Sequence, residues 1–471
     1  MCHLKIRGLI IMEKDAIQNK TINAYPTKEL FISILTRDVT LRDAIGDLLD
    51  NSIDGALRLR PDNNYQGLYV KIGIDVKQNF FKIEDNCGGI PVSIARNYAF
   101  RFGRPEGAEK TEHSVGVFGI GMKRALFRLG KKFEIISTTH NSSFTMEVDV
   151  EEWKKENTNE GNQADWTFMF NDLKEDMEQE FPENERGTSI TVTELHQNVI
   201  ETFEQENDIT ILIKELQREH LFSIDNKLEI TINGILLKSQ ELKLAASDFF
   251  KTAYYENSEG QVKVKIYAGI GEQEKYGDNG GWYIFCNKRL VIGPDQTKIT
   301  GWGIKTPIRI PEYHSQFYRF RGYAFLDAKD PKELPWNTAK TGMDLDSPIY
   351  RSVRLQMINL MRSVMDFLNK LHEETKAVKH DKIDETPLQK AIDQSPIMEL
   401  HEAIGKRDNL AKLFGFPEPA KSKQSISKQV WIRYAISNKE YEHVKEYFET
   451  DKQGDIGRRT FDYFFEREIE S

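Results

Sequence analysis

The chain has 471 residues and a formal net charge of −9, from 65 lysines and arginines against 74 aspartates and glutamates. This mild acidic excess argues against a protein that binds nucleic acid mainly through generic contacts with the phosphate backbone. The length predicts two or three domains with ample core. The three cysteines, Cys2, Cys87 and Cys286, are far apart in the sequence, which disfavours both a disulfide framework and a zinc knuckle.

No apolar run reaches about 18 residues, the length that a membrane-spanning helix requires. The apolar segment 9–11 is too short for the core of a secretory signal. We therefore expect a cytoplasmic protein in a reducing compartment. Met12 could equally be the true start of the protein.

The first 200 residues alternate between helix and strand patterns. Helical periodicity covers 27–37, 43–56 and 124–129. Strand patterns cover 68–75, 79–84, 132–139, 143–150 and 187–195. Two polar stretches, 101–115 and 154–165, are expected to be loops, and the first of them is expected to be mobile.

The pattern restarts in a second α/β domain, expected at 201–345. A helix at 209–219 precedes strands at 228–232, 262–269, 281–287 and 320–326. A long helix is predicted at 346–375. Residues 376–395 are charged and lack apolar periodicity, which predicts a linker. The last part, 396–471, is predicted to be a helical domain.

The helix at 43–56 has two different faces. Its apolar side chains recur at near-helical spacing on one side, whereas Asp47, Asn51 and Asp54 lie at i, i+4 and i+7 on the other. An ordinary surface helix would carry Lys or Glu there for intrahelical pairing. Short acids and an amide instead suit the wall of a polar pocket. A solvated acidic face is the alternative that this stretch leaves open.

A glycine-rich segment, residues 116–123, precedes the helix at 124–129. Backbone N–H groups in such a segment can bind phosphate oxygens at the N-terminus of a helix. A Walker A motif is excluded because Met122 stands where lysine is required, and a Rossmann fingerprint fails because Arg124 stands where the third glycine would fall. The alternative is a simple glycine-rich turn before a helix.

Asp85 stands at the end of a strand and is followed by Gly88 and Gly89. This is typical of a hairpin turn. It also suits a buried carboxylate that accepts a hydrogen bond from an amino group on a ligand ring, with backbone close by at Gly89. Thr188, which opens the strand 187–195, is ordinarily a β-former.

These four motifs, in this order, resemble the GHKL ATPase superfamily, which includes gyrase B, MutL, MORC proteins and the ninety-kilodalton heat-shock chaperones. The MORC, MutL and heat-shock branches are the closest in motif style. The resemblance implies an α+β fold: a two-layer α/β sandwich (the Bergerat fold, a mixed sheet with helices on one face), an S5-like transducer domain and a helical C-terminal region. The ATP-binding domain is expected at 1–200 and the transducer domain at 201–345.

The resemblance also implies that the chain binds ATP with Mg²⁺. Asn51 resembles the family's Mg²⁺ ligand, a hard oxygen donor that suits this ion. Asp85 resembles the adenine-reading carboxylate, held by Thr188, and Asp54 would brace the helix against the glycine-rich segment. The ATP site implied by the resemblance comprises Asn51, Asp54, Asp85, Gly89, Ile90, Gly116, Val117, Phe118, Gly119, Ile120, Gly121, Met122, Lys123 and Thr188.

Two residues depart from the family pattern. Asp47 stands where most relatives have the glutamate that acts as general base, and a misplacement of about 1 Å can cost about 10²-fold in rate. We therefore expect Asp47 to support slow hydrolysis. Cys87 replaces the first glycine of the turn after Asp85.

Two segments of the second domain extend the resemblance. Residues 334–340 are similar to a chaperone segment whose cation reaches the γ-phosphate, which makes Lys340 the second candidate catalytic residue. Residues 281–290 look like a transducer-domain strand of the MORC and MutL branches.

The predicted cycle is that ATP orders the 101–115 lid, docks Lys340 and closes two protomers into a homodimer. One predicted output is a DNA-associated switch in repair or defence. A chaperone-like ATPase acting on a protein client and a non-hydrolysing interaction module are the alternatives.

Overall fold

The computed structural model describes residues 26–103, 112–116, 119–156, 165–306, 308–405, 407–421 and 432–469. They form two compact units, Met1–Ala420 and Lys421–Ser471. Most of the predicted loops 101–115 and 154–165 lies outside the described residues, although residues 154 and 155 end a helix rather than begin a loop. None of the described helices is long and apolar enough to cross a membrane.

The first sheet of the larger unit has eight strands in the order β5-β4-β3-β6-β2-β1-β7-β8. All neighbours are antiparallel except β1 and β7, so the sheet is mixed. Its strands are β1 Tyr69–Asp75, β2 Phe80–Asp85, β3 Gly130–Thr138, β4 Ser143–Asp149, β5 Asp172–Lys174, β6 Gly187–Leu195, β7 Glu229–Ile232 and β8 Ile235–Leu236.

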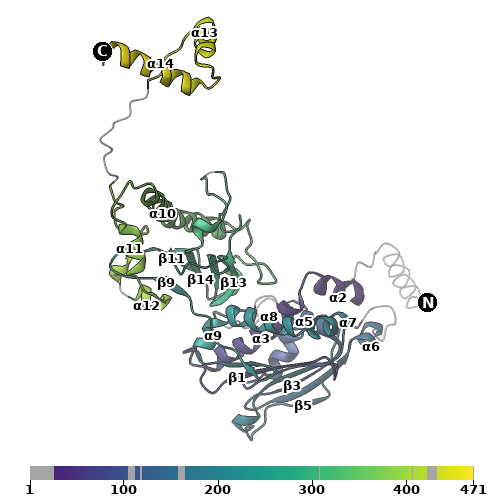
Figure 1. Ribbon diagram of the computed structural model, residues 1–471. Coiled ribbons are helices and arrows are strands. Elements are labelled where there is room, and N and C mark those ends of the chain that lie inside the picture. Colours follow the sequence, from purple (N-terminus) through teal and green to yellow (C-terminus); the bar gives the residue numbers. More distant parts are fainter. Residues whose placement is uncertain are drawn as a thin grey trace, which may run out of the picture. The chain divides into compact units, whose positions relative to one another are not determined.

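Helices cover one face of this sheet (Figure 1). The central helix α3 (Leu41–Leu59) is capped at its N-terminus by Thr40, which forms a capping box with Asp43. Its apolar side, including Ile45 and Leu49, is buried in the core with the strands. The predicted α+β fold with helices on one face of a mixed sheet is confirmed. The other described helical elements here are α2 Lys28–Arg37, α4 Val92–Ile94, η1 Ala95–Ala99, α5 Gly121–Leu129, α6 Val150–Lys155, η2 Glu183–Glu185, α7 Gln197–Phe203, α8 Glu206–Glu219 and α9 Leu221–Asp225.

The strand predicted at 228–232 does not belong to the second domain, and that part of the prediction is wrong. It is β7, which pairs in parallel with β1 and buries Ile230 and Ile232 in the first core. Leu212 and Leu216 of α8 join the same core. The first sheet therefore continues to Leu236, well past residue 200. An apolar strand pattern shows that a strand is buried, but not which sheet it joins.

The second sheet has six strands in the order β13-β12-β14-β11-β10-β16. Helix α10 (Pro348–Lys379) packs on one face, where Met357, Met361 and Phe367 are buried. The other face carries an aromatic cluster that includes Phe285 and Tyr323. The strands are β10 Thr252–Glu259, β11 Val262–Ile270, β12 Gly281–Cys286, β13 Arg289–Asp295, β14 Phe320–Asp327 and β16 Leu410–Ala411.

The linker predicted at 376–395 is wrong as well. Helix α10 runs on to Lys379, and α11 (Pro387–Asp393) buries Leu388 in the second core. The carboxylate of Glu374 accepts the backbone N–H groups of Leu388 at 3.1 Å and Gln389 at 2.9 Å, so it caps α11. Helix α11 spans only two turns, so it is too short to show a recognisable helical periodicity in the sequence.

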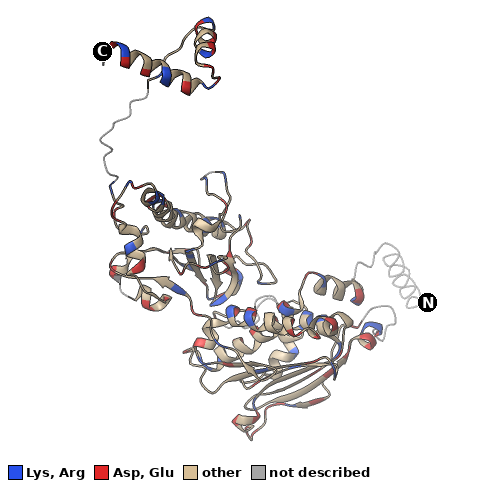
Figure 2. Ribbon diagram, in the orientation of Figure 1, with Lys and Arg blue, Asp and Glu red and all other residues tan. Residues whose placement is uncertain are grey.

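The chain then returns to the second domain instead of starting a C-terminal domain at residue 396. Strand β15 (Ile397–Glu399) pairs with β9 (Lys243–Ala245), α12 spans Leu400–Ile404, and β16 pairs with β10. In the smaller unit, α13 spans Asn438–Phe448 and α14 spans Gln453–Glu468. Figure 2 shows acidic and basic residues interspersed along both of these helices.

The packing of α11 predicts a difference between two neighbouring substitutions. Leu388→Ala should lower the free energy of unfolding by about 2–5 kcal/mol, because it leaves a cavity in the second core. Lys390→Ala, on the exposed side of the same helix, should change it by less than about 0.5 kcal/mol. Chemical denaturation of the full chain measures both changes. Equal effects would contradict the packing of α11 and support the predicted linker.

Candidate functional site

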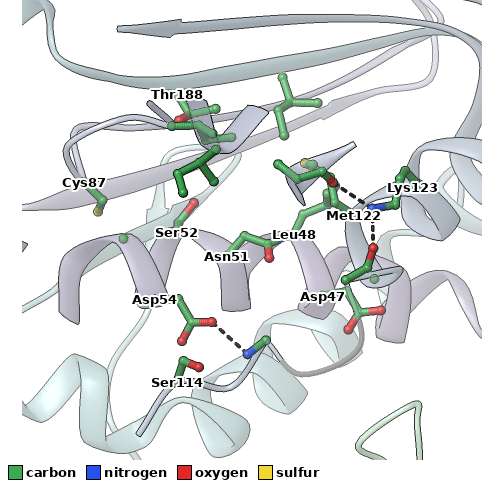
Figure 3. Close-up of a pocket in the computed structure, with 18 of the residues that line it drawn as sticks. Asp47, Leu48, Asn51, Ser52, Asp54, Cys87, Ser114, Met122, Lys123 and Thr188 are labelled. Carbon is green, nitrogen blue, oxygen red and sulfur yellow. Dashed lines mark hydrogen bonds between the residues drawn. The ribbon is translucent and has the colours of Figure 1, made fainter. Parts of the chain in front are cut away.

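A pocket of about 390 Å³ lies between α3, the glycine-rich segment, and strands β2 and β6. Figure 3 shows Asp47, Asn51 and Asp54 along α3, with Met122 and Lys123 on a neighbouring helix. Val117 and Phe118 lie outside the described residues. Every other residue of the predicted site lines this pocket: Asp47, Asn51, Asp54, Asp85, Gly89, Ile90, Gly116, Gly119, Ile120, Gly121, Met122, Lys123, Thr188 and Lys340.

Asn51 and Asp54 differ in how α3 presents them. The Asn51 side chain is exposed to the pocket, and no described residue hydrogen-bonds it. Asp54 is buried and accepts the backbone N–H groups of Val115 and Gly116, each at 2.8 Å. Burial raises the pKa of Asp54. Asp54 thus ties α3 to the start of the glycine-rich segment.

The glycines let the helices approach closely. Gly119 has a φ of +64°, which favours glycine. Gly121 begins α5, and a Cβ there would stand 3.1 Å from the carboxyl carbon of Asp47. The N-terminus of α5 can therefore lie directly against α3 beside Asp47.

Lys123 is almost fully buried and turns back into the protein. Its Nζ donates to the carbonyl of Ala99 at 2.7 Å and to the carbonyl of Gly119. Burial lowers the pKa of Lys123 to about 7. One ammonium group therefore joins the residues on either side of the 101–115 segment.

At the far end of the pocket, Asp85 is held by three donors. It accepts from the Ser52 hydroxyl at 2.6 Å, the Cys87 N–H at 2.8 Å and the Thr188 N–H at 3.3 Å. Burial raises the pKa of the Asp85 carboxyl. Thr188 thus contacts Asp85 through its backbone, while its hydroxyl lies 3.1 Å from Ser137 Oγ.

The turn after Asp85 does not require glycine at position 87. Positive φ angles fall on Gly88 (+88°) and Gly89 (+71°), whereas Cys87 is buried with an ordinary backbone conformation. A Cβ at Gly89 would stand 2.2 Å from the carbonyl oxygen of Thr138, so this position does require glycine. The difference from the family pattern at Cys87 therefore introduces no backbone strain.

The second domain contributes Lys340 to the pocket. Its Nζ lies 3.2 Å from Asp47 Oδ1 and 2.6 Å from Asp50 Oδ2. Burial lowers the pKa of Lys340, but Asp50 and Asp47 together raise it above the usual value. Arg124, on α5, donates to Asp47 Oδ2 from its Nε at 2.7 Å and from Nη2. Both oxygens of Asp47 are therefore engaged by cations.

Sequence reasoning missed four residues of this charged cluster: Arg124, Asp50, Arg289 and Glu219. Arg289, at the start of β13, donates from Nε to Asp50 Oδ1 at 2.8 Å. Its other nitrogens reach the Lys340 carbonyl and Glu219, each at 3.2 Å. Burial opposes ionisation of Asp50, but Arg289 and Lys340 hold its pKa well below the usual range. The one available signal was Asp50 itself, because an acid next to the apolar side of a helix needs a partner once it is buried.

A divalent cation at this site would have few protein ligands. Among the described residues, no group of three His, Cys, Asp or Glu side chains could hold a metal ion. The uncommitted side chain of Asn51 offers one oxygen at the pocket wall. One protein oxygen, completed by phosphate oxygens and water, suits octahedral Mg²⁺.

The chain matches a known protein family over part of its length. Residues 39–179 match the sequence model of the family described as histidine kinase-, DNA gyrase B-, and HSP90-like ATPase. This range contains α3, the Asp85 turn and the glycine-rich segment, and it ends before Thr188 and Lys340. No curated protein matches the chain. The chain therefore carries an ATP-binding ATPase domain of the GHKL superfamily.

Proposed function

We propose that the protein is a slow, Mg²⁺-dependent ATPase whose second domain takes part in hydrolysis. The observation that carries the proposal is the reach of Lys340, from the second domain, to Asp47 on the wall of the pocket. A cation from one domain thus lies beside the proposed general base of the other. A terminal phosphate bound at such a site would contact residues of both domains and could change their relative position.

The nucleotide would lie along the pocket with its base at the Asp85 end. Asp85 would accept the adenine amino group, and Ile90 would lie against the ring. The triphosphate would reach the glycine-rich segment, and Asn51 would ligate the metal. A magnesium ion held there by Asn51 would neutralise part of the charge of the phosphates.

Hydrolysis in this site needs one oxygen of Asp47 to orient a water molecule. The water oxygen forms a bond to the terminal phosphorus while the bond from that phosphorus to the bridging oxygen breaks. ADP leaves with the electron pair, and the proton of the water passes to Asp47. Arg124 holds Oδ2 and Lys340 holds Oδ1, so Oδ1 becomes available only when Lys340 moves to the phosphate. We therefore expect slow turnover.

Because cations bind both oxygens of Asp47, the site also supports a second candidate function. The protein would then bind ATP without hydrolysing it. In that case Lys340 would stay on Asp47 Oδ1 with the nucleotide bound. ATP would then act only through the contacts that it makes in the pocket.

The Asp47→Asn variant separates these candidates. Removing the proton acceptor should lower kcat by about 10²-fold or more and leave Mg-ATP binding nearly unchanged. Calorimetry measures binding, and phosphate release measures turnover. Asp38→Asn, an exposed acid at the end of α2, is the matched control and should change neither.

If the unmodified protein binds Mg-ATP and releases no phosphate, the binding-only candidate stands. If Asp47→Asn turns over at the unmodified rate, Asp47 is not the base. If Mg-ATP neither releases heat nor raises the melting temperature, the nucleotide proposal fails.

Lys340→Ala should slow turnover far more than it weakens binding. A cation that stabilises the charge developing in the transition state contributes about 10²-fold or more to kcat. Its loss should change the Kd for a non-hydrolysable ATP analogue only modestly. Lys332→Ala, an exposed lysine in the same stretch of the second domain, is the control. Equal losses in kcat and in affinity would indicate that Lys340 binds the substrate and has no specific role in the transition state.

We also propose that ATP brings two copies of the chain together as a homodimer, with ordering of the 101–115 segment. The smaller unit supports association, because among its described residues only Ile456 is buried, while Phe461, Phe464 and Phe465 are exposed.

Light scattering should show twice the monomer mass with a non-hydrolysable ATP analogue, and the monomer mass with ADP or without nucleotide. Asn51→Ala, which removes the proposed metal ligand, should stay monomeric throughout. One mass under all conditions would contradict nucleotide-driven association.

A further inference from the structure

Two buried carboxylates on α3 share one lysine. Asp47 and Asp50 are three residues apart, and Lys340 Nζ lies within hydrogen-bonding distance of both. Each carboxylate also has an arginine of its own. Arg124 holds Asp47 Oδ2 from α5, and Arg289 holds Asp50 Oδ1 from β13. All five side chains are at most 6 % exposed.

The sharing makes Lys340 different from the two arginines. If Lys340 leaves, Asp47 keeps Arg124 and Asp50 keeps Arg289, so no buried carboxylate is left without a cation. If Arg289 is removed, Lys340 is the one cation among the described residues that is left at hydrogen-bonding distance of Asp50, since His220 Nδ1 lies 3.8 Å from Asp50 Oδ1. A buried charge that loses its partner is strongly destabilising, so Asp50 would then retain the lysine.

Hydrogen bonds hold the backbone around Lys340 in place, whereas its long side chain can rotate. The N–H of Lys340 donates to the carbonyl of Asn337 at 3.0 Å, and the N–H of Thr341 donates to the Asn337 side chain at 3.0 Å. Arg289 donates to the Lys340 carbonyl at 3.2 Å. Movement of the ammonium group therefore needs only side-chain rotation, for which lysine is better suited than the planar arginine fork.

Arg289 has room for this role because Gly46 lies beneath it. A Cβ at Gly46 would stand 3.3 Å from Arg289 Nη2 and 3.4 Å from Glu219 Oε2. The guanidinium crosses α3 at this point to reach Asp50 and Glu219. The same side chain thereby contacts α3, α8 and the turn that carries Lys340.

We propose that Arg289 is a positioning residue that frees Lys340 for the terminal phosphate. Arg289 neutralises Asp50, so the lysine is a transferable cation that can leave Asp47 Oδ1 when ATP arrives. This inference rests on the proposed ATPase function. It assigns to the second domain a pair of cations with separate tasks: Arg289 stays with α3, and Lys340 moves.

The test uses the full chain with Arg289→Met, which removes the charge and keeps an apolar stem of comparable length. Lys340 should then stay with Asp50, and kcat should fall by about tenfold or more, with a smaller change in the Kd for ADP. The preference for the ATP analogue over ADP should shrink by a similar factor, because the terminal phosphate no longer gains the lysine.

Adding Asp50→Asn to Arg289→Met supplies the decisive comparison. With the Asp50 carboxylate gone, Lys340 keeps only Asp47 Oδ1, the contact that it also leaves in the unmodified protein. The double variant should therefore recover most of the lost kcat and most of the lost preference for the analogue. The two changes should therefore be non-additive by about tenfold. If Arg289 only packs the domains together, the second change cannot restore activity.

Lys288→Gln is the matched control. Lys288 is the neighbouring residue and also reaches the first domain, with its Nζ 2.9 Å from Asn63 Oδ1, but it contacts neither Asp47 nor Asp50. It should leave kcat within about twofold, as expected for a surface contact. Arg289→Lys keeps a charge near Asp50 and should lie between Arg289→Met and the unmodified protein. It provides the comparison if Arg289→Met does not fold.

The outcomes separate this inference from the proposed function. If the unmodified protein binds neither nucleotide, the proposed function fails. If it binds and hydrolyses ATP, and Arg289→Met lowers kcat no more than Lys288→Gln does, the Arg289 assignment is wrong. If it binds ATP without turnover, the preference for the analogue over ADP tests Arg289 alone.

Discussion

Charge pairing among buried side chains at the junction of the two domains is the constraint on which the rest of the site depends. Asp47 and Asp50 on α3 are buried. Arg124 of α5 binds Asp47, Arg289 of the second domain binds Asp50, and Lys340 of the second domain binds both. Removing one member of a buried ion pair typically costs about 3–5 kcal/mol. The two domains are thus held together at this point by the same helix that forms the pocket wall. A ligand that offers these cations another anion can alter the junction, and this is the part proposed above for the triphosphate of ATP.

The glycine-rich segment is connected to the same junction. Asp54 accepts the N–H groups of Val115 and Gly116, while the second domain holds the residues just before them. Asn287 donates to the Ser114 carbonyl at 3.1 Å, and the N–H of His113 donates to the Lys329 carbonyl at 3.0 Å. The segment proposed to bind phosphate is therefore tied to the second domain, which also carries the lysine proposed to bind the terminal phosphate. Direct contacts thus connect the proposed nucleotide site with the second domain.

The pocket was largely predictable from the sequence, because its parts are local motifs. The spacing of Asp47, Asn51 and Asp54 places them on one side of a helix in any fold. Arg124 and Arg289 were not predictable, because their roles arise from contacts made across the tertiary structure. The same limit explains the misplaced strand β7 and the false linker at 376–395. Periodicity reports burial, whereas the partner that buries an element depends on the complete fold.

The aspartate at position 47 is better understood as part of this arrangement than as a shortened glutamate. Gly121 brings α5 so close that a Cβ there would stand 3.1 Å from the Asp47 carboxyl carbon, and Arg124, three residues later, binds that carboxylate. A side chain one methylene longer would have to displace either the glycine or the arginine. The length of Asp47 thus matches the approach of α5, and Lys340 occupies the oxygen that Arg124 does not bind. In the proposed reaction, the slow step would therefore be the release of that oxygen by the lysine, more than the reach of the carboxylate to water.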